Sequence, residues 1–93
     1  MPSAKEVVER AKRWRNATVV FDDDNFSVVE GEYRHDDGNW SKTMGVRWNG
    51  EADGPGYPKL FGNGVFMVVP DWMAPAIKES CVEYIFTSVK DTN

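Results

Sequence analysis

The stretch Trp40–Trp48, WSKTMGVRW, is the strongest indication of the fold, because apolar and polar side chains alternate along it at a period of two. One parity carries two tryptophans, a methionine and a valine, interrupted only by Lys42, whereas the other carries Arg47 among small and polar residues. Such alternation predicts a β-strand with one buried face. Because a slip of one residue would expose the apolar set, the register of this strand is well specified.

The chain before this strand predicts a helix followed by two strands. Ser3 and Glu6 have the spacing of a capping box, and helically spaced apolar residues follow, so a helix is expected over residues 4–15. Runs rich in β-branched residues predict strands over 17–21 and 26–34, with an acidic turn between them. The helical stripe consists of Val7, Val8, Ala11 and Trp14.

The remaining elements are marked by glycine, proline and apolar runs. Gly31 inside the second strand indicates a bulge or a close backbone approach, and the Asp-Gly pair within residues 35–39 predicts a hairpin turn. Val65–Val69 is apolar at every position, which predicts a central strand that is covered on both faces, or by helices on one face and a partner on the other. A helix is expected over about 72–90, with Pro75 near its start. Its apolar stripe is Ile77, Cys81, Tyr84, Ile85 and Val89.

These elements predict a single α+β domain over residues 1–93, in the order α-β-β-β-β-α. Hairpins join the first three strands, so we expect a four-stranded, mainly antiparallel sheet with the N-terminal and C-terminal helices packed on one face. A chain of 93 residues is long enough for one hydrophobic core but not for a second.

Composition and charge exclude several function classes. Five basic and two acidic side chains leave +3 in residues 1–15 and therefore −7 in the rest, so nucleic acid is not an expected partner. No apolar run approaches the ~20 residues of a membrane span, and the first residues lack the apolar stretch of a signal peptide, so a cytoplasmic location is expected. Cys81 is the only cysteine and is interpreted as a small buried hydrophobe. Without a phosphate-binding glycine pattern or a set of metal ligands, no cofactor and no metal are expected.

The segment Gly45–Asp71 concentrates the candidate binding residues around a loop rich in glycine and proline. An arginine flanked by aromatic residues and glycines can hold a carboxylate or phosphate through a planar two-point contact. A loop of roughly fifteen residues over 50–64 is uncommon unless it is functional or disordered. In the alternative interpretation, Arg47 pairs with a neighbouring carboxylate and the aromatic residues only anchor the loop. The predicted ligand-binding residues are Arg47, Asn49, Tyr57, Asp71 and Trp72.

Three functions follow from these observations. The first is a non-enzymatic binding module for a small anionic or planar ligand or a peptide. The second, less favoured, is a small hydrolase or isomerase that uses His35, Asp36 or Asp37 for acid–base chemistry. The third is a structural protein–protein interaction module. Four tryptophans and a doubly apolar strand exceed what two helices on one face can cover, so a homodimer is expected.

The strings Gly45–Gly50, Gly56–Pro58 and Val68–Asp71 resemble short proteins encoded by bacterial mobile gene cassettes, including those of integrons. The likeness covers residues 45–71 only. It implies a bacterial, cytoplasmic accessory protein, often a small α+β dimer, and it carries over no catalytic residue.

Overall fold

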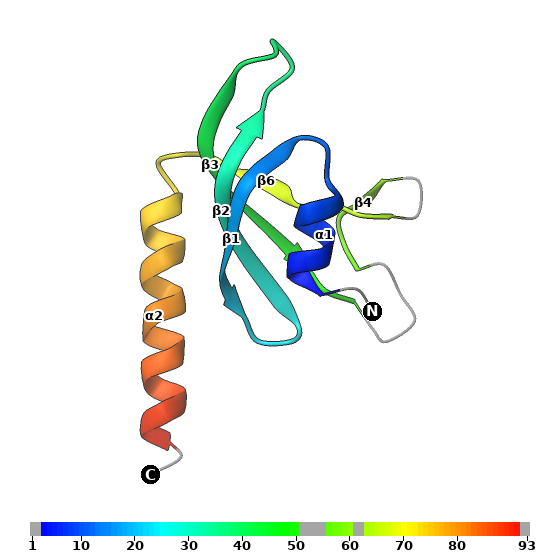
Figure 1. The fold of residues 1–93 in the computed structure, drawn as a ribbon. Helices are drawn as coiled ribbons and strands as arrows, with labels where there is room; N and C mark the ends of the chain where they lie inside the picture. The colour runs from blue at the N-terminus through cyan, green and yellow to red at the C-terminus, as the bar shows by residue number, and fades with distance from the viewer. Residues whose placement is uncertain (1–2, 51–55, 61–62, 92–93) are drawn as a thin grey trace.

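The structure, a computed structural model, describes residues 3–50, 56–60 and 63–91 of the chain. A short helix is followed by three long strands, a small two-stranded ladder, a short sixth strand and a long helix (Figure 1). The main sheet has the strand order β1-β2-β3-β6 with every pair antiparallel, which confirms the predicted α+β fold. The elements are α1 Ala4–Arg10, β1 Trp14–Asp22, β2 Phe26–Arg34, β3 Trp40–Trp48, β4 Lys59–Leu60, β5 Asn63–Gly64, β6 Met67–Val69 and α2 Ala74–Asp91.

The hairpin of β2 and β3 forms the centre of the sheet. Its register runs without interruption over all nine residues of each strand, so the predicted bounds of both strands are confirmed. Gly31, expected at a bulge or a close approach, lies against Ala17, because a Cβ on Gly31 would come within 2.7 Å of the Ala17 Cα. The missing side chain therefore lets β1 pass close to β2.

Helix α1 is shorter than the sequence pattern predicts. The Glu6 N–H donates to the Ser3 Oγ at 3.1 Å, which confirms the cap, but the helix ends at Arg10 and not at residue 15. β1 begins at Trp14, whose ring packs edge-on against Tyr33 with centroids 5.1 Å apart. Burial of a large apolar side chain contributes about 1.5–3 kcal/mol, whereas helix propensities differ by only a few tenths of a kcal/mol per residue. Packing therefore overrides the local helical spacing.

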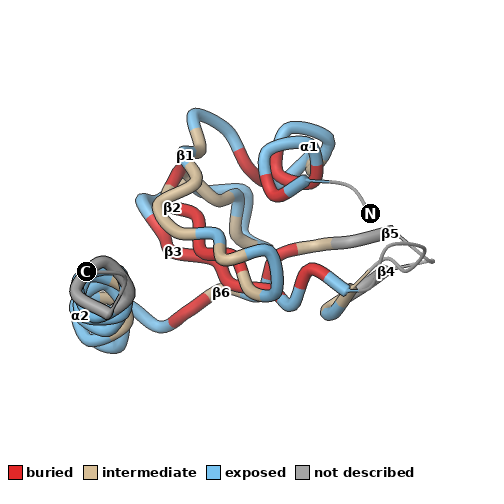
Figure 2. The backbone as a smooth tube through the Cα atoms, turned by 90° about the horizontal axis from the view of Figure 1, so that it is seen from below, coloured by how far each residue is buried: buried red, intermediate tan, exposed pale blue. Residues whose placement is uncertain are grey.

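The two helices cover opposite faces of the sheet (Figure 2). Neighbouring residues of β2 separate the two cores, because Val29 packs with α1 while Val28 packs beneath α2. The expected placement of both helices on one face is thus corrected. The physical reason lies in β3, where residues 43–47 are all buried, and a strand buried on both sides needs cover on both. The α1-side core is Ala4, Val7, Val8, Trp14, Val29 and Phe66, and the α2-side core is Val28, Met44, Val46 and Val69.

The apolar run Val65–Val69 supplies an edge strand and not the central strand that was expected. β6 pairs only with residues 44–46 of β3, and Met67 is 55% exposed. The doubly buried position belongs to β3 instead. Helix α2 begins at Ala74 with Pro75 in its first turn, where the missing N–H removes no intrahelical hydrogen bond.

Part of the long loop predicted over 50–64 returns to the end of β3. The Trp48 N–H donates to the Tyr57 carbonyl at 2.6 Å, and the Tyr57 N–H donates to the Trp48 carbonyl at 2.9 Å. The ladder of β4 and β5 also lies in this segment and was not predicted. Residues 51–55 and 61–62 lie outside the described residues. The prediction of an ordered loop is therefore tested only at residues 50, 56–60 and 63–64.

Candidate functional site

Four polar side chains, Asp22, Ser27, Arg47 and Asn49, gather at the end of the central hairpin and are called the polar cluster below. Ser27 is 0%, Arg47 1% and Asn49 4% exposed. Ser27 and Arg47 face each other across β2 and β3, on the side of the sheet covered by α1. The Ser27 Oγ donates to the Asn49 Oδ1 at 2.5 Å, and the Asn49 Nδ2 donates to the Asp22 Oδ1 at 3.1 Å. Both ends of the Asn49 amide are therefore satisfied inside the protein.

Gly56 lies directly over the polar cluster. Its φ is +75°, in the left-handed region that favours glycine. A Cβ at this position would collide with the Trp48 carbonyl oxygen and the Arg47 Nη2, and would lie 2.6 Å from the Asn49 carbonyl oxygen. The close approach of Gly56, together with the backbone bridge between Tyr57 and Trp48, explains why Arg47 has almost no exposed surface.

Arg47 is held as a buried cation. Its guanidinium carbon lies 5.8 Å from the centroid of the Phe66 ring, a cation–π distance. Burial lowers the pKa of Arg47 from its ordinary value, because removal of water disfavours the charged form. An arginine keeps its proton in proteins regardless. In this conformation the side chain stabilises the end of the hairpin and offers no surface to a ligand.

The other predicted site residues lie elsewhere. Tyr57 is bridged to Trp48 by its backbone, but its side chain is 66% exposed. β6 runs antiparallel to β3 and away from Arg47, so Asp71, which follows β6, lies at the opposite end of the strand pair. Trp72 is 77% exposed. The structure therefore brings Arg47 and Asn49 together beside the Tyr57 backbone, and it does not bring Asp71 or Trp72 to them.

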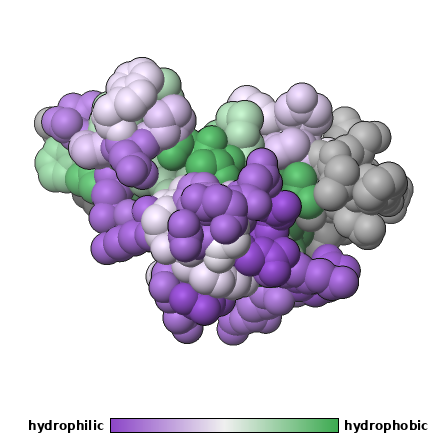
Figure 3. Space-filling view, turned by 90° about the horizontal axis from the view of Figure 1, so that it is seen from above, coloured by the Kyte–Doolittle hydropathy of each residue, from purple (hydrophilic) through white to green (hydrophobic). Residues whose placement is uncertain are grey.

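The residues of the alternative acid–base site occupy the turn between β2 and β3. An imidazole nitrogen of His35 lies 2.5 Å from the Ser41 Oγ, and Asp36 pairs with Arg13 at 3.0 Å. The Asn39 N–H donates to the Asp37 carboxylate at 2.9 Å and lowers the pKa of Asp37. Viewed from the side of this turn, the surface is largely hydrophilic (Figure 3). His35 and Asp37 thus bond within the β2–β3 hairpin, whereas Asp36 links its turn to Arg13.

Sequence reasoning missed the apolar surface of α2. The predicted stripe is only partly buried, because Ile77 and Cys81 pack on the sheet whereas Tyr84 and Ile85 are 53% and 49% exposed. A second line of apolar residues on the same helix is more exposed still, with Val82 at 65% and Phe86 at 68%. The spacing of four residues between these two was the available signal, since it places both on one side of a helix. The side chain of Val89 lies outside the described residues.

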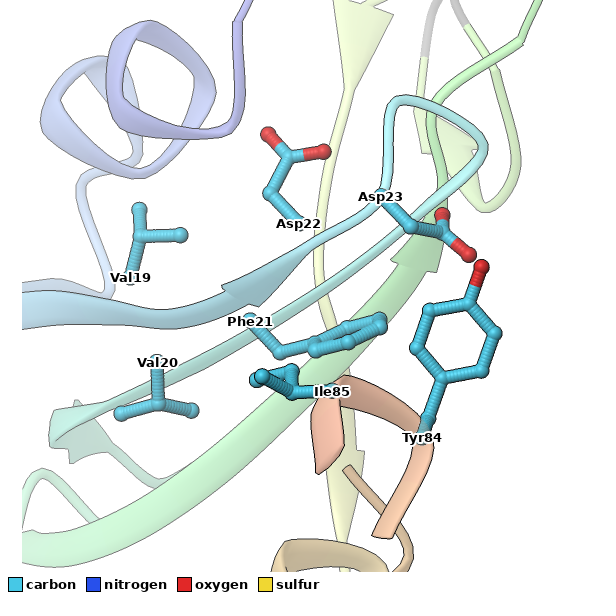
Figure 4. Close-up of a pocket in the computed structure, with 7 residues that line it drawn as sticks. All are labelled: Val19, Val20, Phe21, Asp22, Asp23, Tyr84 and Ile85. Atoms are coloured by element: carbon cyan, nitrogen blue, oxygen red, sulfur yellow. The ribbon is translucent and has the colours of Figure 1, made fainter. Parts of the chain in front are cut away.

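A groove lies between the end of β1 and α2 (Figure 4). It has a volume of about 460 Å³, and the apolar part of its lining comes from β1 and from Tyr84 and Ile85 of the helix. The rings of Phe21 and Tyr84 meet edge-to-face with centroids 5.6 Å apart. Its lining residues are Val19, Val20, Phe21, Asp22, Asp23, Tyr84 and Ile85.

The residues that the structure describes can be checked for metal binding, for a reactive thiol and for a membrane-spanning helix. Among them, no group of three histidine, cysteine or acidic side chains is placed to hold a metal ion. Cys81 is half-buried. Its burial, and to a smaller extent the nearby charge of Asp23, raise the pKa of the thiol, so the thiolate is disfavoured. Of the helices described, neither is both long and apolar enough to cross a membrane.

Comparison with protein-family models, with curated proteins and with solved structures found no match to this chain. The resemblance to mobile-cassette proteins therefore stays a prediction from sequence, and the functional argument rests on the geometry.

Proposed function

We propose that the protein is a non-enzymatic protein-interaction module that assembles as a homodimer through α2. The observation that carries the proposal is the division of this helix. Ile77 and Cys81 pack on the sheet, whereas Val82 and Phe86 are 65% and 68% exposed. Large apolar side chains exposed together on a helix usually mark an interface.

Val82 and Phe86 form a line along α2, called the α2 seam below. Successive residues of a helix are turned by about 100°, so residues four apart lie on nearly the same side. A second copy of α2 carries the same line, so a symmetric pair of helices would cover both.

The size of the exposed surface sets the expected affinity. Val82 and Phe86 are 65% and 68% exposed, which corresponds to roughly 200 Å² of apolar surface. A stable interface buries about 800 Å² on each partner. We therefore expect a weak dimer, with a dissociation constant on the order of tens to hundreds of micromolar.

Sedimentation analysis over about 10 to 500 µM tests the homodimer, since this range brackets the expected dissociation constant. The wild-type protein should shift from monomer to dimer as the concentration rises. Phe86→Glu should remain monomeric throughout, because it places a charge on the α2 seam. A circular-dichroism spectrum equal to that of the wild type would show that the variant is folded, as expected for a residue that is 68% exposed.

Thr87→Glu is the matched control, because it adds the same charge to an exposed neighbour that faces another side of the helix. This variant should dimerise like the wild type. A wild-type protein that stays monomeric at the highest concentration would contradict the proposal, as would equal loss of the dimer in both variants.

The cytoplasmic location expected from sequence, and the bacterial origin implied by the resemblance, form part of this proposal. The sequence holds one cysteine and therefore no internal disulfide, which is usual for proteins of a reducing compartment.

A further inference from the structure

We propose that the groove between β1 and α2 binds an extended apolar segment of another protein that carries a lysine or arginine at one end. Tyr84 and Ile85 form its helical wall, whereas Val82 and Phe86 of the α2 seam are absent from its lining. The proposal therefore goes beyond the homodimer, and each can fail without the other.

The floor of the groove is apolar because β1 is irregular there. Val19 lies opposite Val29 of β2 and Phe21 lies opposite Val28, so Val20 is an extra residue in the ladder. Such a bulge re-aims side chains. Both Val20 and Phe21 consequently pack toward the α2-side core, in place of alternating between the faces.

The shape of the groove favours an extended segment. β1 is an edge of the main sheet, and five consecutive residues of the chain, 19–23, line the groove, so it follows this edge. Its volume of about 460 Å³ is in the range of small ligand pockets, which admits a few side chains and not a whole helix. Edge strands flanked in this way bind extended peptides in other proteins, with side-chain pockets giving specificity.

The negative charge at one end of the groove favours a basic residue at the corresponding end of the bound segment. Asp23 lines the groove, and in Figure 4 its carboxylate lies on the side to which the Tyr84 hydroxyl points. Asp24 follows it in the turn, and none of the ion pairs found in the described part of the chain uses either carboxylate. The charge of Asp23 also reaches α2, where it contributes to the raised pKa of the Cys81 thiol. A lysine or arginine placed here would meet uncompensated negative charge.

Two synthetic peptides test the proposal, Lys-Lys-Val-Thr-Leu-Thr and Glu-Glu-Val-Thr-Leu-Thr, which differ only in the charge of one end. In ¹⁵N-NMR titrations the lysine peptide should shift the amides of residues 19–23, Tyr84 and Ile85. It should bind about two- to fivefold more tightly than the glutamate peptide, and added salt should shrink this difference.

Asp23→Asn is the decisive variant. The Asp23 Oδ1 accepts the N–H groups of Asn25 and Phe26, and an asparagine keeps that acceptor while removing the charge. This variant should lose most of the preference for the lysine peptide. Asp37→Asn makes the same change in the other turn and should keep the preference.

Three results would overturn the proposal. The first is the absence of shifts at the groove amides, and the second is equal binding of the two peptides by the wild type. The third is a shift of the amides of residues 19–23 on concentrating the protein without peptide, because a second copy of the chain would then occupy the groove and not only pair along α2.

Discussion

Arg47 illustrates, at the scale of a single residue, how one pattern can serve two functions. An arginine among glycines and aromatic residues suits an anion site, and it suits equally well the anchoring of a loop. The structure leaves 1% of Arg47 exposed and places Gly56 over its guanidinium. Residue type and spacing identified an important position, whereas its burial depends on chain segments that are distant in the sequence.

Arg47→Ala should therefore destabilise the protein. Removal of a fully buried side chain leaves a cavity and polar neighbours without their partner, which we expect to cost about 2–4 kcal/mol. Urea denaturation monitored by tryptophan fluorescence measures this change. Arg34→Ala removes an exposed arginine from the same hairpin and should change the stability by less than about 0.5 kcal/mol. Equal stability of Arg47→Ala and the wild type would support the ligand-site interpretation instead.

Substitution of two glycines distinguishes the cost of backbone strain from the cost of steric contact. Gly56 and Gly38 have φ values of +75° and +87°, but a Cβ on Gly56 would strike the polar cluster whereas nothing lies within 4 Å of one on Gly38. Gly38→Ala should cost about 1 kcal/mol from strain alone, and Gly56→Ala should cost at least about 2 kcal/mol. Thermal unfolding of both variants checks the order. A smaller loss for Gly56→Ala would contradict the tight cover over Arg47.

At the scale of elements, the ends of α1 show which signals are local. The cap at Ser3 depends on groups three residues apart and was correctly predicted. The end at Arg10 was not predicted, because Trp14 fits two structures. Its spacing suits the apolar stripe of a longer helix, and it suits equally well a strand that packs on Tyr33. The position of β2, which carries Tyr33, determines that Trp14 lies in a strand and not in the helix.

The cap itself predicts a measurable loss. Ser3→Ala removes the oxygen that accepts the Glu6 N–H and should lower the free energy of unfolding by about 1 kcal/mol. Chemical denaturation provides the measurement. Ser80→Ala, at an exposed position inside α2, should be neutral or slightly stabilising, since alanine is the better helix former. Equal losses in the two variants would show that the cap does not act in solution.

In the molecule as a whole, the two helices do not cover the two faces of the sheet equally. α1 closes over one face, whereas the exposed end of α2 leaves apolar surface that a second copy could bury. If the dimer forms, the melting temperature should rise with protein concentration, because binding of the native state stabilises it. A hundredfold increase in concentration should raise it by a few degrees. Differential scanning fluorimetry measures this shift, and Val82→Glu should abolish it.

Local sequence patterns were enough to establish the α+β class, the bounds of β2 and β3, the cap of α1 and the close approach at Gly31. These features depend on alternation, spacing or the size of one residue, which are local properties. The folded chain was needed to show that the helices cover opposite faces, that Val65–Val69 supplies an edge strand, and that Arg47 is buried beneath Gly56. Burial is set by which surfaces meet after the chain folds, and an apolar or charged residue in the sequence does not specify which segment will cover it.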